Sequence, residues 1–199
     1  MSWLVGFQDI DRVMSVQSIL DRSPMSNTVK TERIRVAEEQ IDTHRQAIDY
    51  DTRAYPIELI VLHFLEKDEE GCSKIYVPEY HQEMNWDVRR QSQFIESILL
   101  GLPLPSILVA EIENTERLEI VDGVERVRTL AAFMTNQLRL ENLTVLDSLN
   151  NFYFKDLAPS RQRKFTNTSI LTIVLSEKGD EKVRKEIYNR INKPGVLIA

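Results

Sequence analysis

One short stretch near the middle of the chain limits the possible folds more than any other feature. A β-type run at residues 119–121 ends in Asp122-Gly123 and passes without a linker into a helical pattern that carries Arg126. Such a junction directs the free N–H groups of a helix's first turn, together with a cation, at one point. The stretch therefore predicts an α/β fold and, at the junction, a site suited to a phosphate group.

The residues on either side of the junction predict alternating helices and strands. Asp87 is a suitable N-cap and Gly101 a suitable C-terminal stop for a helix with one apolar face. The polar turn at residues 113–116 predicts that the strands flanking it form a hairpin. The predicted elements are a helix opening at Pro56 and ending near residue 64, a strand at 75–77, the helix after Asp87, strands at 107–111 and 117–121, a helix at 123–134, strands at 152–154 and 170–175, a helix at 158–165 and a final helix from Asp180.

The N-terminal part of the chain has a different character. Residues 8–20 have the apolar spacing of a short helix, and residues 21–27 resemble a linker. From about Lys30 to Tyr50, apolar residues recur at near-helical intervals in a polar background, which predicts a long, largely exposed helix; they are Ile34, Ala37, Ile41 and Ile48. We therefore divide the chain into an N-terminal helical extension and linker at residues 1–28 and an α/β domain at residues 29–199 that includes the long helix.

Composition excludes several classes of protein. A single cysteine, Cys72, rules out a disulfide framework and a cysteine-based metal site, and the three histidines have no ligand spacing, so we predict no protein-built metal site. No apolar run approaches the roughly 20 residues of a membrane span, which makes a cytoplasmic location the default and a membrane partner unexpected. The net charge of −6 argues against a surface dominated by nucleic-acid contacts. Residues 155–193 are nevertheless basic, so they form either a DNA- or RNA-binding face or solvated helix faces.

Local spacing around the junction permits a purely structural interpretation. Asp122 and Glu125 have the spacing of a capping box, and Asp122 and Arg126 are four residues apart, so their side chains can form an ion pair. In this interpretation the three residues only begin a helix, with the cap worth about 1 kcal/mol.

A wider pattern favours a functional interpretation. Three segments follow one another at residues 77–86, 94–105 and 121–126, and they resemble the ParB/sulfiredoxin-like N-terminal domain of GmrSD-type restriction proteins. That family has Pro-x-Tyr-Gln-Arg near a Trp, a helix ending in Gly-x-Pro-x-Pro, and Asp-Gly-Gln-Gln-Arg followed by Leu-Thr-Thr-Leu. Thr129-Leu130 and the late Arg190-Ile191-Asn192 with Gly195 extend the likeness, which covers residues 55–197.

The resemblance implies a small mixed sheet surrounded by helices, with the N-terminal helical part as an extension. It also implies that the chain senses a nucleotide or DNA within a bacterial antiviral defence system, while a separate effector nuclease domain or protein cuts foreign or modified DNA. The resemblance implies that Asp122 and Arg126 contact the nucleotide or a catalytic water, and we add Glu125, which lies between them, as a third candidate catalytic residue. The implied nucleotide-binding residues are Tyr80, Trp86, Gly123, Thr129 and Asn192.

Departures from the family pattern bear on activity. Val124 and Glu125 replace the two glutamines, and His81-Gln82 replaces Gln-Arg after Tyr80. Loss of amides removes hydrogen bonds worth about 1 kcal/mol each, and a carboxylate beside a polyphosphate repels it unless a cation such as Mg²⁺ intervenes. We therefore expect weakened or absent hydrolysis of a nucleoside triphosphate.

Several alternatives stay open at this point. Glu125 with Asp122 is a candidate general base or Mg²⁺ ligand of a metal-dependent NTPase or nuclease. The long helix is a candidate for self-association into a homo-oligomer or for docking a protein partner, in which case the signature is vestigial. Tyr80 and Trp86 are either base-stacking residues or buried aromatics, and Asn192 is either a ligand contact or a helix cap.

Overall fold

The structure, a computed structural model, describes residues 27–46, 49–79, 85–176, 186–187 and 189–191. The chain divides into two units, residues 1–45 and residues 46–199. The helix predicted at residues 8–20 lies outside the described residues, and the domain boundary predicted after residue 28 stays a prediction.

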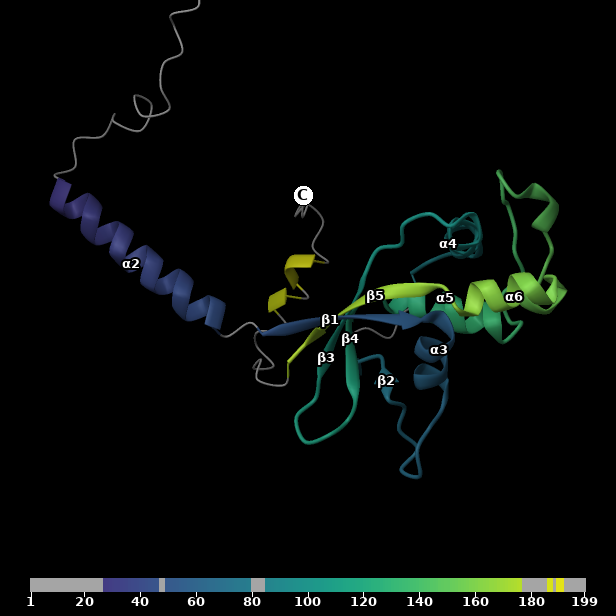
Figure 1. The fold of residues 1–199 in the computed structure, drawn as a ribbon, viewed down its shortest axis with the longest axis horizontal. Coiled ribbons are helices and arrows are strands. Elements are labelled where there is room, and N and C mark those ends of the chain that lie inside the picture. Colours follow the sequence, from purple (N-terminus) through teal and green to yellow (C-terminus); the bar gives the residue numbers. More distant parts are fainter. Residues whose placement is uncertain (1–26, 47–48, 80–84, 177–185, 188, 192–199) are drawn as a thin grey trace, which may run out of the picture. The chain divides into compact units, whose positions relative to one another are not determined.

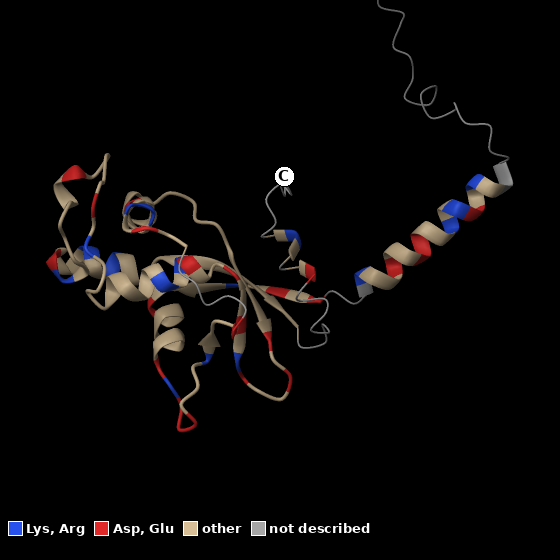
Figure 2. Cartoon of the chain, turned by 180° about the vertical axis from the view of Figure 1, so that it is seen from behind, with Lys and Arg blue, Asp and Glu red and all other residues tan. Residues whose placement is uncertain are grey.

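The described part of the first unit is one helix, α2 (Asn27–Gln46). All its side chains from residue 29 to residue 45 are exposed, as the polar sequence predicts. The guanidinium of Arg35 forms ion pairs with Glu32 and Glu39, one turn before and one turn after it, and Figure 2 shows both charge signs along the helix. The predicted extension of this helix to Tyr50 is wrong, because Tyr50 opens a strand.

The second unit is built on a mixed sheet, which confirms the predicted α/β class (Figure 1). Its strands are β1 (Tyr50–Pro56), β2 (Ile75–Tyr76), β3 (Ile107–Glu111), β4 (Leu118–Asp122) and β5 (Ser169–Leu175). Their order across the sheet is β1-β5-β3-β4-β2. The pairs β1–β5 and β3–β4 are antiparallel, whereas β3–β5 and β2–β4 are parallel. The predicted hairpin of β3 and β4 is confirmed, with a bulge between Leu108 and Val109.

Helices follow the strands where caps and prolines allow them to begin. They are α3 (Ile57–Leu65), α4 (Val88–Leu100), α5 (Val124–Met134) and α6 (Pro159–Thr166). The Asp87 carboxylate caps α4 by accepting a hydrogen bond from the Arg90 amide at 2.8 Å, and Gly101 ends this helix at a φ of +76°. Pro56 was predicted as the first residue of α3. It is instead the N-cap, because it still belongs to β1.

The helices bury one face of the sheet in the main core. Ile107, Val109, Ile120 and Val174 of the strands pack there with apolar residues of α3, α4, α5 and α6. The alternate residues Leu108, Ala110, Val121 and Leu175 point to the other face, where they pack with Ile187 and Ile191. Because successive side chains of a strand point to opposite faces of the sheet, both faces of β3 and β4 lie in apolar surroundings.

A long connection between α5 and α6 contains no strand among its described residues, so the strand predicted at residues 152–154 is wrong. Phe154–Asp156 form a short 3-10 helix, η3. The Phe154 ring packs edge-on against Phe133, with ring centroids 5.6 Å apart.

Helix α4 holds the same connection through two buried polar side chains. The Glu96 carboxylate, 6% exposed, accepts hydrogen bonds from the backbone amides of Val145 at 3.0 Å and Leu146 at 2.7 Å. The Ser92 hydroxyl accepts one from the Glu141 amide at 3.0 Å. The connection is therefore anchored to the core although it contains only short 3-10 helices.

None of the helices in the described part of the chain combines the length and the apolar character that membrane crossing requires.

Candidate functional site

The junction between β4 and α5 is built around Gly123. This residue is buried and has a φ of +104°, a left-handed conformation that side-chain-bearing residues rarely adopt. A Cβ atom here would lie 3.1 Å from Nη2 of Arg126 and 3.3 Å from Cγ1 of Ile107. Glycine is therefore required both by the backbone conformation and by the close approach of two side chains.

Gly123 is also the N-cap of α5, and no side chain caps this helix. The predicted capping box of Asp122 and Glu125 is wrong, because Asp122 still lies in β4, paired with Leu108. The first-turn amides of α5 consequently have no side-chain acceptor, which is the arrangement that favours an anion at a helix N-terminus.

The Arg126 side chain turns back over Gly123. Its Nη2 donates to Asp122 Oδ2 at 2.7 Å and to the Ser106 carbonyl oxygen at 3.0 Å. The predicted ion pair is thus confirmed, but it is not at the surface, since the Arg126 side chain is 14% exposed and that of Asp122 28%. The pair joins the end of β4 to the segment that leads into β3.

Glu125 ties a different segment to the same turn. Its Oε1 accepts a hydrogen bond from the Asn85 amide at 2.7 Å, which places the residues just before α4 beside the start of α5. Both carboxylates of the predicted catalytic set are therefore engaged in contacts within the protein.

Three polar atoms at the start of α5 lack partners. They are Glu125 Oε2, Arg126 Nε and Arg128 Nη1, and no other buried side-chain nitrogen or oxygen of the described residues lacks a hydrogen bond. Native proteins satisfy the large majority of such atoms, so each of these exceptions calls for an explanation such as a ligand, an ion or an ordered water. Two of the three atoms are donors of arginines and one is an acceptor.

Other predicted site residues lie in less accessible places. Thr129 is fully buried, and its hydroxyl donates to the Glu125 carbonyl oxygen at 2.7 Å. Trp86 is half-buried, packs edge-on against Phe94 with centroids 5.6 Å apart, and carries the Arg90 guanidinium 4.8 Å above its ring. These contacts match the alternative of a packed aromatic for Trp86. Tyr80 and Asn192 lie outside the described residues.

Sequence reasoning did not identify several groups at the junction. The Ser106 carbonyl and the Asn85 amide are backbone groups whose positions depend on the tertiary fold, and no sequence signal marks them. Arg128 lies within the signature and was not assigned a role. It lines a cavity of about 350 Å³ beside Phe64 and Tyr76.

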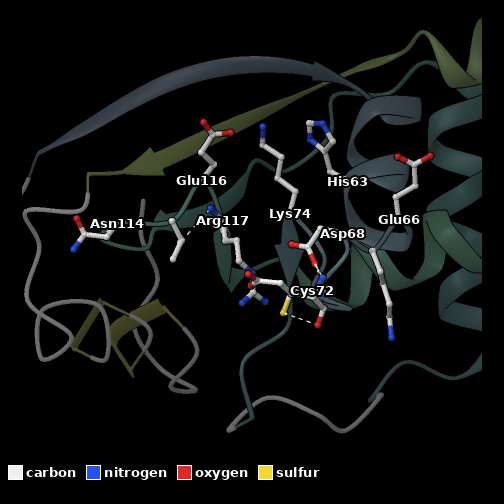
Figure 3. Close-up of a pocket in the computed structure, with 11 residues that line it drawn as sticks. His63, Glu66, Asp68, Cys72, Lys74, Asn114, Glu116 and Arg117 are labelled. Atoms are coloured by element: carbon white, nitrogen blue, oxygen red, sulfur yellow. Dashed lines mark hydrogen bonds between the residues drawn. The ribbon is translucent and has the colours of Figure 1, made fainter.

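A larger pocket lies away from the junction. It has a volume of about 560 Å³ and is formed by the loop after α3 and the β3–β4 turn (Figure 3). Its groups serve the loop itself, because Asp68 accepts the Glu70 and Cys72 amides at 3.0 and 2.8 Å, and Arg117 donates to the Ser73 carbonyl oxygen. Burial and the nearby Lys74 lower the pKa of His63, whereas Glu66 acts in the opposite direction.

The residues offer limited support for a protein-built cation site. Among the described residues, no group of three or more His, Cys, Asp or Glu side chains is arranged to hold a metal ion. Because the Asp122 carboxylate is paired with Arg126, a Mg²⁺ ion here would need phosphate oxygens as further ligands.

The basic segment is only partly described. Arg161 and Lys164 of α6 line a groove of about 250 Å³ with residues 98–104, the segment that carries the Gly-x-Pro-x-Pro pattern. Most of the remaining basic residues, from Lys178 to Lys185 and at Lys193, lie outside the described residues.

The fold and the junction together define a class: a ParB-like α/β domain in which a central strand passes through a glycine into a helix bearing arginine. Residues 61–198, well over half of the chain, match the model of the GmrSD restriction endonuclease N-terminal domain, and the chain belongs to this family. Searches of curated proteins and of solved structures gave no match.

Proposed function

We propose that this domain of a GmrSD-type restriction protein senses a nucleotide by binding its phosphate at the start of α5, with hydrolysis weakened or absent. The observation that carries the proposal is the unpartnered, buried Nε of Arg126, which lies beside Gly123 at a helix start that no side chain caps. A phosphate accepts hydrogen bonds from amides and guanidinium groups, which are the donors present here.

Binding requires the turn to rearrange. Solvent does not reach the three unpartnered atoms, so the Arg126 guanidinium must exchange its contact with the Ser106 carbonyl for the incoming phosphate. Glu125 Oε2 needs a donor rather than an anion, and a ribose hydroxyl or a base amine supplies one. A nucleotide carries phosphate oxygens that accept hydrogen bonds and ribose hydroxyls or base amines that donate them, so one molecule supplies both kinds of group.

The same contacts support weak catalysis. The Asp122 carboxylate is held by Arg126, and one oxygen of Glu125 is held by the Asn85 amide, so neither is placed as a free base for a water molecule. Val124, in the position of the first family glutamine, is 1% exposed and packs in the core. We assign the cutting of DNA to a separate nuclease domain or protein.

Calorimetric titration of the full chain with ATP, GTP and inorganic phosphate, each with and without Mg²⁺, tests the proposal. We expect one nucleotide to bind more tightly than inorganic phosphate. Arg126→Gln should weaken its binding at least about tenfold, because a charge-assisted hydrogen bond contributes about 1.5–3 kcal/mol. Arg139→Gln is the matched control, since Arg139 is exposed and pairs with Glu141 in the connection after α5.

Two results decide between the proposal and its alternative. Absence of nucleotide binding, or equal losses in both arginine variants, contradicts the proposal. A phosphate-release assay covers hydrolysis: metal-dependent turnover that Asp122→Ala abolishes would establish the NTPase alternative instead.

DNA contact is a second candidate function, favoured by the position of Arg161 and Lys164 along the α6 groove. Fluorescence anisotropy with labelled duplex over a salt series tests it. We expect affinity to fall as salt rises, with a shallower slope when both residues are changed to alanine. Binding that is absent at every salt concentration rules this candidate out.

A further inference from the structure

Helix α2 is the whole described part of the first unit, so no packing among the described residues of that unit accounts for its stability. Its side chains from residue 29 to residue 45 are exposed, and these include Ile34 at 55% and Ile41 at 47%. Isolated helices in water depend on good helix formers, and most helices in proteins are stabilised by packing. Seven of the 20 residues in α2 are β-branched, which weakens a helix: Thr28, Val29, Thr31, Ile34, Val36, Ile41 and Thr43.

The apolar residues of α2 form a narrow seam. Ile34, Ala37 and Ile41 are separated by three and then four residues, which is the a–d–a spacing of a coiled coil, and the next d position is His44. Arg35 lies at position b, and its ion-pair partners Glu32 and Glu39 both lie at position f. All three are away from the seam. The polar side of the helix is therefore satisfied within the helix, and the seam is the face left for a partner.

The charges of α2 favour a second α2 over a strongly charged partner. The helix carries four basic residues and four acidic ones, so its formal charge is zero with His44 neutral: Lys30, Arg33, Arg35 and Arg45 against Glu32, Glu38, Glu39 and Asp42 (Figure 2). In a parallel pair, Arg33 at position g faces Glu38 at position e of the other helix, on both sides of the seam. In an antiparallel pair with the same seam, Glu38 of one helix lies against Glu38 of the other, and the two negative charges repel each other.

We infer that α2 binds α2 of a second copy of this chain as a parallel, two-stranded coiled coil. In parallel coiled coils, isoleucine at position a together with leucine at d favours two strands, and Ile34 and Ile41 meet the first of these conditions. Ala37 and Lys30, both at d positions, bury little apolar area, so the dimer is weak and depends on protein concentration. This inference rests on different residues from the nucleotide site.

Sedimentation equilibrium of the full chain over a concentration series measures the dimer. We expect the average mass to rise towards twice the 23.2 kDa of one chain. Ile34→Asp and Ile41→Asp should keep it at the monomer value. Val36→Asp is the matched control, because Val36 is an exposed apolar residue of the same helix at position c, away from the seam. This variant should dimerise like the unmodified chain.

Charge exchange and cross-linking test the parallel arrangement. Arg33→Glu and Glu38→Arg should each weaken the dimer, and the two together should restore it. In a Cys72→Ser background, Ile34→Cys should form an interchain disulfide on oxidation, whereas Val36→Cys should not. A chain that stays monomeric at all concentrations overturns the inference. The inference is also overturned if both cysteine variants cross-link equally, or if the double charge exchange fails to restore the dimer.

Discussion

At Gly123 the backbone conformation and the neighbouring side chains impose separate costs on any substitution. Gly123→Ala forces a Cβ into a left-handed residue and places it against Arg126 and Ile107. The conformation alone costs about 1–2 kcal/mol, and the contacts add to that. We expect Gly123→Ala to lower the free energy of unfolding in urea by more than about 2 kcal/mol.

Gly101→Ala provides the control for this comparison. Gly101 has a φ of +76°, but a Cβ there would meet no atom within 4 Å. Its alanine variant should therefore show the conformational cost alone. Equal losses for the two variants would mean that the close approach of Arg126 contributes nothing.

His63 makes the stability of the fold depend on pH. Burial and Lys74 lower its pKa in the folded protein below 6.5, so the unfolded chain binds more protons as the pH falls through that value. Stability from this group is fully present above pH 6.5 and is lost as the pH falls towards the folded-state pKa. We expect His63→Gln to reduce the decrease in urea stability below pH 6.5, while leaving the curve above pH 7 parallel to that of the unmodified chain. Identical pH profiles below 6.5 would contradict this.

The residue-scale features differ in how well they could be predicted. Asp122-Gly123 marks the strand-to-helix junction, because few residues other than glycine accept the conformation required, and the spacing to Arg126 indicates the ion pair. The capping box was predicted wrongly, since spacing cannot show that Asp122 remains in a strand. The contacts of Arg126 with Ser106 and of Glu125 with Asn85 use backbone groups, which depend on the tertiary fold rather than on residue type.

At the scale of elements, α4 supports the connection after α5 through Glu96. Glu96→Ala would leave the amides of Val145 and Leu146 without their acceptor in a half-buried place. Because hydrogen bonds to a charged group contribute about 1.5–3 kcal/mol, we expect a loss of about 2–3 kcal/mol in urea unfolding. Glu113→Ala, at an exposed position of the β3–β4 turn, should cost far less. Equal effects of the two variants would refute the anchoring role of Glu96.

Elements with strong local sequence signals were predicted well. Elements whose conformation depends on pairing with a distant strand were not. Asp87 and Gly101 bracket α4 as their caps indicate, and the apolar run of β3 has the predicted bounds. Strand β1 was missed because its residues, from Tyr50 to Pro56, are largely exposed and lack apolar alternation. Its strand conformation comes from pairing with β5, which a local pattern does not report.

At the scale of the whole molecule, the chain consists of two units, and all five strands of the sheet lie in the second. We expect a chain that begins at residue 46 to unfold cooperatively, with a thermal midpoint equal within error to that of the full chain at low concentration. Differential scanning calorimetry measures both. A midpoint that falls sharply on removal of residues 1–45 would show that the sheet needs the first unit.

The pairing of β1 with β5 determines when the sheet can be completed during synthesis. Among the described strands, β1 is synthesised first and pairs with β5, which is synthesised last: Tyr50 pairs with Leu175 and Pro56 with Ser169. Closing so long a loop is entropically costly and slow. During synthesis, β1 therefore has no partner strand until residues 169–175 have left the ribosome. Chains interrupted before residue 169 keep an unpaired strand edge that is prone to aggregate.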